Sequence, residues 1–244
     1  LDHLDGEPTL TGRTPRERAF ISLTQRRAAA HAATPPRVPS PMPGVERRML
    51  DRVGAEVARA STIVRHAPES RFSAHTHDGG EGFIVLEGVF RDEHGDFPAG
   101  SHVRDPPTSS HTPGAAQGCV IFVKLWQFDP DDRAGVRIDT AAAEPVPAPG
   151  RPGGGTIALH ADAREAVRIG TWAPAARIVL DAPGGFEALV IAGGFAEGGE
   201  GFAPQSWLRL PAGARLDAVA GPQGARVWVK TGHLAAVQAS PAVA

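Results

Sequence analysis

Two histidines and a glutamate in the first half of the chain have the spacing of a metal site. His75 and His77 are separated by one residue, and Glu81 follows after the turn Asp78-Gly79-Gly80. On a β-strand, side chains two residues apart point to the same face, so the two imidazoles can grip one ion. The glycines of the turn let the chain approach closely without a Cβ clash. This arrangement predicts a metal-binding strand followed by a tight turn.

Glu81 begins an apolar run whose inward-facing residues are predicted to be Glu81, Phe83 and Val85. A carboxylate beside two apolar side chains is costly to bury unless another group compensates its charge. A bound cation would compensate it. A further histidine, His111, lies beyond Gly100 and is preceded by a short Ser/Thr run.

The elements that must position these residues are predicted to be strands. Short apolar runs, such as 81–90, 119–128, 188–195 and 225–230, alternate with Gly, Pro and Asp clusters from residue 45 onward. With 29 glycines and 23 prolines, the chain suits many strands joined by turns, and the spacing is typical of an all-β sandwich or barrel. Residues 14–31 are predicted to form a short basic helix, because Thr14-Pro15 resembles a helix start.

An internal repeat divides the chain into two similar parts. Residues 79–90 match residues 184–195, and residues 101–106 match residues 206–211, both at an offset of 105. We therefore predict two copies of one all-β unit. The predicted divisions are an N-terminal extension (1–44), a first module (45–138), an Ala/Pro/Gly-rich linker (139–155), a second module (156–235) and a C-terminal tail (236–244).

The first module resembles the cupin superfamily. His75-x-His77-x3-Glu81-x6-Gly88 matches the first cupin motif, and Gly100-x5-Pro106-x-Thr108-x2-His111 resembles the second, with Thr108 where the family has Gly. The amino-acid sequence of residues 38–128 resembles that of the cupin subfamily named for the anti-sigma factor ChrR. The resemblance implies two tandem jelly-roll barrels, each a double-stranded β-helix. It also implies a metal held by His75, His77, Glu81 and His111.

The second module lacks these ligands. At the repeat offset, Glu81 corresponds to Phe186 and His111 to Leu216, while the two-histidine segment corresponds to 181–183, Asp-Ala-Pro. We expect side chains to fill this barrel and one metal to bind per chain. Glu187 is displaced by one position and is expected to face outward.

Several other residues have weaker claims to a role. His102 could line the pocket as an acid or base, and we assign it as the candidate catalytic residue, although an outward orientation is the alternative. His94 lies in a polar turn and is expected to be solvated. Lys124 either lies between the modules or points at the site, and Lys230 at the matching place in the metal-free copy favours the structural role. Cys119 is expected to be a small buried hydrophobe.

Charge and hydropathy exclude some classes of partner. The formal net charge is −2, so we expect neither nucleic acid nor an anionic membrane as a partner. The sequence has no run of 18 apolar residues, and no signal-peptide pattern opens it. We therefore expect a cytoplasmic protein.

Three functions fit these residues. The first is a ChrR-like bicupin that binds Zn, Fe, Mn or Ni and carries out dioxygenase-type chemistry on a small molecule, because three imidazoles and one carboxylate leave coordination positions open. The second is a metal-containing sensor of the anti-sigma-factor type, although residues 1–44 contain no cysteine for the family's separate zinc domain. The third is a small-ligand-binding protein without turnover. A homodimer is a further alternative, and a regulatory role would imply a protein partner.

Overall fold

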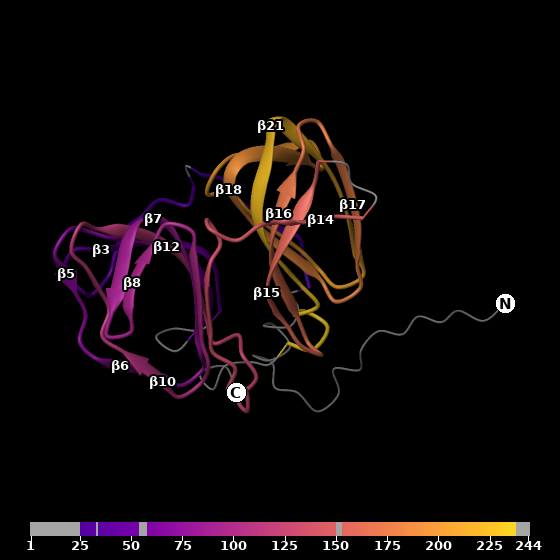
Figure 1. Cartoon of the computed structure of the whole chain (residues 1–244). Helices are drawn as coiled ribbons and strands as arrows, with labels where there is room; N and C mark the ends of the chain where they lie inside the picture. The colour runs from indigo at the N-terminus through magenta and orange to yellow at the C-terminus, as the bar shows by residue number, and fades with distance from the viewer. Residues whose placement is uncertain (1–24, 33, 54–57, 150–152, 238–244) are drawn as a thin grey trace.

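The computed structural model describes residues 25–32, 34–53, 58–149 and 153–237, and these residues form strands and turns without a helix. Figure 1 shows two β-barrels side by side, the first in indigo to magenta and the second in orange to yellow. The prediction of two all-β barrels is confirmed. No described helix has the length and hydropathy needed to span a membrane.

The first barrel is built around a ten-stranded antiparallel sheet with the order β13-β9-β7-β12-β4-β3-β2, to which β5, β8 and β11 add at one end. A separate pair, β6 and β10, closes it. Its strands are β2 (Val38–Pro39), β3 (Val45–Val53), β4 (Arg59–His66), β5 (Ser70–Arg71), β6 (His75–His77), β7 (Glu81–Asp92), β8 (Gly95–Pro98), β9 (Ser101–Asp105), β10 (Ser109–His111), β11 (Gly114–Ala115), β12 (Cys119–Leu125) and β13 (Val136–Asp139).

The second barrel uses a nine-stranded sheet with the order β1-β20-β18-β21-β16-β15-β14, to which β17 and β19 add. Its strands are β1 (Ala28–Ala30), β14 (Val146–Pro147), β15 (Gly155–Ala161), β16 (Ala166–Trp172), β17 (Arg177–Ala182), β18 (Phe186–Glu197), β19 (Glu200–Phe202), β20 (Trp207–Leu210) and β21 (Ala214–Thr231). Strands β7 and β18 have the same length of 12 residues and lie at the repeat offset, so the internal repeat is structural.

The repeat includes a shared bulge. Gly88 in β7 and Gly193 in β18 have φ angles of 71° and 66°, a left-handed conformation that favours glycine. A Cβ at either position would lie 2.2 Å from a carbonyl oxygen, that of Gly118 or Gly224. The pairing register shifts two residues before each glycine, at Leu86 in β7 and at Ile191 in β18, so the side chains that follow change faces.

The expected helix over residues 14–31 is wrong for its described part. Residues 14–24 lie outside the described residues, and Ala28–Ala30 form β1, which pairs with β20 of the second barrel. Tertiary pairing outweighs the helix propensity of alanine here. Arg27 secures the strand through ion pairs of 2.9 and 3.0 Å with Glu197 and Glu200.

Two separate cores fill the barrels, and a third joins them. Residues such as Phe83, Val85 and Ile121 pack inside the first barrel. The third cluster combines outward-facing residues of both barrels, among them Phe122 and Trp228, whose rings lie 5.2 Å apart. Strand β12 is therefore buried on both faces, which explains its apolar sequence from residue 119 to 123.

A buried ion pair crosses this joint. Lys124 Nζ contacts the carboxylate of Glu187, which also accepts hydrogen bonds from Ser61 Oγ at 3.3 Å and Trp207 Nε1 at 2.6 Å. Glu187 faces away from its own barrel, as expected, but it is buried against the other barrel. Burial alone would raise the pKa of Glu187, yet Lys124 and His233 hold it well below its usual range. The structural role expected for Lys124 is thus the one observed.

Candidate metal centre

Two short strands bring the three histidines together. Strands β6 and β10 pair antiparallel, with His75 opposite His111 and His77 opposite Ser109. His75 and His77 share a face because they are two residues apart. Ring nitrogens of His75, His77 and His111 all lie within 4.8 Å of one another, and the ring centroids are 4.7 to 5.1 Å apart.

Glu81 completes the group from the first position of β7. Its Oε2 lies 3.2 Å from His77 Nε2 and 3.4 Å from His111 Nε2. His77 Nε2 and His111 Nε2 are 2.9 Å apart. Nitrogen and oxygen donors that converge in this way are the ligand set that zinc and other divalent transition metals accept. The residues present therefore fit the metal that the motif implies.

The electrostatics of the group call for a cation. Burial raises the pKa of Glu81 to about 8, and Asp105 and Asp92 add to the effect. Burial, together with the neighbouring His111 and His75, lowers the pKa of His77 to about 3. Neutral imidazoles are competent ligands, and a bound cation would favour the ionised carboxylate.

Contacts at the Nδ1 atoms of His111 and His75 fix the orientations of these two rings. Asp92 Oδ2 lies 3.3 Å from His111 Nδ1, and the side chain of Asp92 is fully buried. His75 Nδ1 lies 3.0 Å from the carbonyl oxygen of Ser73. Both contacts occupy Nδ1 and leave Nε2 facing the group, as in metal sites where a carboxylate or carbonyl orients a ligating histidine.

Asp92 is a functional residue that the sequence interpretation missed. It stands in a run of polar residues, which suggested a solvated turn. The bulge at Leu86 moves the inward face from odd to even positions, so Phe90 and Asp92 are buried while Arg91 is exposed. The alternation of Phe90 with Asp92 beyond a motif glycine was the available signal.

A second carboxylate lies beside Glu81. Asp105 on β9 is paired with Glu81 across the strands, and these two residues and His111 form a further group of potential ligands. Asp105 Oδ1 accepts a hydrogen bond of 3.1 Å from Arg137 Nη2, whereas Oδ2 is buried without a partner. Burial raises the pKa of Asp105, which makes a protonated, hydrogen-bonding role available to it.

The histidine group opens into a cavity of about 380 Å³. Most of its wall is apolar, and His66 and Arg47 are the polar residues that approach from β4 and β3. A volume of this size suits a small organic molecule. The lining includes Val45, Val64, Phe72, Phe90, Ile121, Val123, Leu125 and Trp126.

The other candidate residues lie elsewhere. His102 is buried and lines a narrow space between the barrels with Lys124 and Lys230, not the cavity over the histidines. Its position gives the predicted catalytic role no support. His94 is exposed in the turn between β7 and β8. Cys119 is buried in the first core, and burial raises the pKa of its thiol to about 12.

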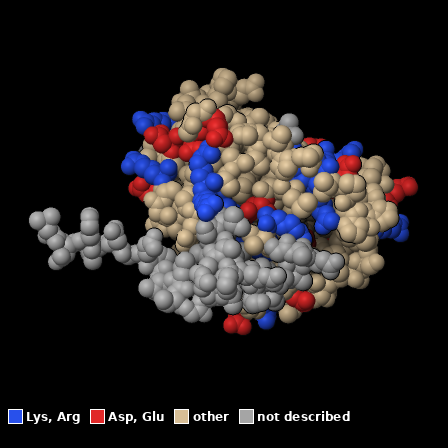
Figure 2. Space-filling view, turned by 180° about the vertical axis from the view of Figure 1, so that it is seen from behind, with Lys and Arg blue, Asp and Glu red and all other residues tan. Residues whose placement is uncertain are grey.

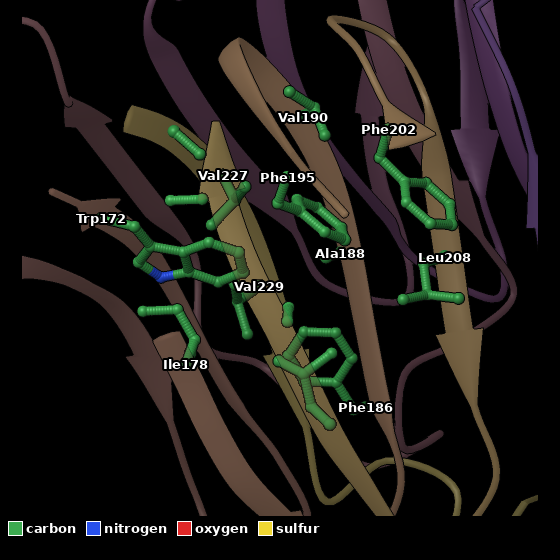
Figure 3. Close-up of a cluster of buried hydrophobic side chains, with 14 of the residues drawn as sticks. Trp172, Ile178, Phe186, Ala188, Val190, Phe195, Phe202, Leu208, Val227 and Val229 are labelled. Carbon is green, nitrogen blue, oxygen red and sulfur yellow. The ribbon is translucent and has the colours of Figure 1, made fainter. Parts of the chain in front are cut away.

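In the second barrel, apolar side chains occupy the places of the ligands. Phe186 and Leu216 are buried in its core together with Ala182. Figure 3 shows Phe186, Val190, Phe195 and Val229 pointing toward one another inside this barrel. In the described residues, one more potential ligand group, Asp132, His160 and Asp162, lies where the loop after β12 meets the end of β15. Asp132 is already engaged by Arg104 there.

Charges on the molecular surface are mixed. Figure 2 shows cationic and anionic side chains interspersed on one face, without a broad area of a single sign.

Two fused antiparallel barrels, one with three histidines and a glutamate inside it, define a double-cupin protein. Residues 25–129 match the family model described as the ChrR cupin-like domain, so the first barrel is a ChrR-like cupin domain. Among curated proteins, none matches the chain.

Solved structures agree on the fold. A candidate dioxygenase from Nostoc punctiforme PCC 73102 superposes with a TM-score of 0.71 at 12% identity, covering 88% of this chain and 86% of the other. Protein YlbA from E. coli gives a TM-score of 0.67 at 14% identity, with 86% and 92% covered. An oxalate decarboxylase variant from Bacillus subtilis gives 0.59 at 13% identity, with 84% and 77% covered. At these identities the likeness concerns the fold alone.

Proposed function

We propose that the first barrel binds one divalent transition metal through His75, His77, Glu81 and His111 and uses it in dioxygenase-type chemistry on a small molecule. The observation that carries the proposal is the convergence of three imidazoles and one buried carboxylate at a largely apolar cavity of about 380 Å³. Without a cation, the carboxylate of Glu81 would be buried at high cost.

A divalent metal bound there would supply Lewis acidity and open coordination positions for oxygen or a chelating substrate. The protein supplies the rest. Glu81 balances part of the ionic charge, and Asp92 holds His111 in the tautomer that leaves Nε2 free. Phe72 and Phe90 add apolar rings to the cavity wall beside the group. The candidate dioxygenase among the structural neighbours supports this class of chemistry.

A second candidate is a metal-dependent sensor module without turnover. The match of residues 25–129 to the ChrR cupin-like domain favours it. The resemblance to the subfamily named for the anti-sigma factor ChrR implies a regulatory role. In that role, metal or small-molecule binding in the same barrel would alter contact with a protein partner. Simple small-ligand binding without turnover is the third candidate.

The test is metal analysis of protein purified without added metal, followed by oxygen-uptake assays with small diketones, thiols and flavonols. We expect about one metal per chain in the parent. His77→Ala should lose the metal, whereas His94→Ala, which removes an exposed histidine outside the group, should keep it.

Oxygen uptake that disappears with the metal would support the enzyme. A full metal complement without turnover would favour the sensor or the binding protein. Two metals per chain, or equal metal content in the His77→Ala and His94→Ala variants, would contradict the proposed site.

A further inference from the structure

The cavity beside the histidine group has one cationic side chain in its wall. Arg47 lies on β3, two residues after Val45, and is opposite Val64 on β4. Val45, Arg47 and Val64 all line the cavity, as expected for residues on the same face of the sheet. Arg47 is half-buried.

Arg47 has no protein partner among the described residues. Its Nε atom is buried without a hydrogen bond, although Asp78 and Glu81 line the same cavity. The adjacent Arg48 behaves differently. It faces the other side of the strand and donates a hydrogen bond of 2.7 Å to Gln205 Oε1. The guanidinium of Arg47 is thus available to a ligand in the cavity.

A second unpartnered nitrogen lies next to it. His66 is opposite Val45 on β4 and also lines the cavity. Its Nδ1 is buried without a partner, and its ring packs 5.2 Å from Phe72 and 6.0 Å from Phe90. Arg47 and His66 are therefore diagonal neighbours on two paired strands, beside the apolar residues Val45, Val64 and Phe72 of the wall.

We propose that the cavity selects a short, mainly apolar carboxylate that also carries a carbonyl oxygen. Arg47 binds the carboxylate and His66 adds a hydrogen bond, while the carbonyl end faces the histidine group. A planar guanidinium matches a carboxylate in two parallel hydrogen bonds, and the apolar walls suit the carbon chain. This substrate class rests on the proposed function, since the second oxygen is directed at the metal.

The probes are 4-oxopentanoate and its amide, which has nearly the same shape without the charge. Calorimetry with zinc-loaded and with metal-free protein measures both affinities. We expect the parent to bind the acid at least tenfold more tightly than the amide. Arg47→Gln should weaken the acid at least tenfold and leave the amide unchanged.

Arg65→Gln is the matched control. Arg65 lies on the same sheet, is exposed and pairs with Glu46 at 3.3 Å. The substitution therefore removes an equal charge outside the cavity. Its affinities should equal those of the parent. Arg47→Lys keeps the charge and should retain part of the preference, which decides the question if Arg47→Gln does not fold.

Equal affinity of the parent for acid and amide, binding of neither, or equal behaviour of Arg47→Gln and Arg65→Gln would overturn this inference. Metal analysis of the same samples reports separately on the proposed function. Protein that holds one zinc without preferring the acid refutes the inference alone. Protein that holds no zinc refutes the metal site, and the acid preference of the metal-free form still decides the role of Arg47.

Discussion

Lys124→Met would test whether the two barrels dock as the structure shows. The substitution keeps an unbranched chain of similar length but removes the cation that faces Glu187. The carboxylate would keep its hydrogen bonds from Ser61 at 3.3 Å and Trp207 at 2.6 Å, and its contact of 3.2 Å with His233 Nε2. It would lose its principal charge partner in a region without solvent access.

Breaking one side of a buried ion pair costs about 3–5 kcal/mol, because the remaining charge is left uncompensated. With a urea dependence of about 2–3 kcal/mol per molar, the midpoint should fall by about 1–2.5 M. The double variant Lys124→Met/Glu187→Gln should recover much of the loss, since no isolated charge remains. Urea titration followed by tryptophan fluorescence suits the measurement, because Trp207 and Trp228 lie at the joint.

The pH dependence gives an independent check. The folded-state pKa of Glu187 is depressed below its ordinary value of 4.5, so its contribution is present above pH 4.5 and is lost as the pH falls toward the folded value. Without Lys124, burial raises the pKa of Glu187, so the variant takes up a proton at a higher pH than the parent, and the stability difference between parent and Lys124→Met should shrink as the pH falls. Arg177→Met, which breaks the exposed pair with Asp217, is the control and should leave the midpoint unchanged. A Lys124→Met midpoint equal to this control would refute the buried joint.

Three further predictions concern the barrels themselves. Glu81→Gln keeps the shape of the side chain and removes its charge, so metal affinity measured by competition with a chelator should fall tenfold or more, about 1.4 kcal/mol, with the fold intact. Asp92→Asn should weaken the metal by about 10–100-fold in the same assay, because His111 loses its charged hydrogen-bond partner. Phe186→Ala should cost about 3–5 kcal/mol in urea titration through the cavity it leaves, while the metal content measured by elemental analysis stays at the parent level.

Local patterns were enough to predict the inward face of β7 up to its bulge. Glu81, Phe83 and Val85 alternate with the period of a strand, and all three are buried as predicted. Beyond Gly88 the same rule fails, because the bulge adds a residue and reverses the faces. Asp92 therefore looked like a turn residue although it is fully buried behind His111.

Other features depend on contacts between distant segments. The alternation of β18 correctly placed Glu187 outside its own barrel, but alternation carries no information on what covers that outer face. The strand Ala28–Ala30 is a similar case, because its pairing with β20 joins residues about 180 positions apart. The predicted divisions at residues 44 and 155 are crossed in the same way, since β2 joins the first sheet and β14 the second.

The joint also explains how two similar barrels can dock in one defined way. Lys124 and Lys230 hold equivalent positions in the repeat, and both are buried there, so each requires an anion. Glu187 serves Lys124, and Glu165 lies 2.6 Å from Lys230. Both carboxylates belong to the second barrel.

The corresponding positions of the first barrel hold residues without negative charge. Gly82 stands where the second barrel has Glu187, and at the offset of 106 that joins β4 to β16, Arg59 stands where it has Glu165. Two first barrels placed face to face would bury lysines and arginines without anions, which is strongly unfavourable. The charges therefore favour the pairing of unlike barrels. In β7 a carboxylate at position 81 points inward to the histidines, and in β18 a carboxylate one step further along the repeat points outward to the joint. A one-residue displacement on a strand thus separates the residue of the metal site from the residue that holds the two barrels together.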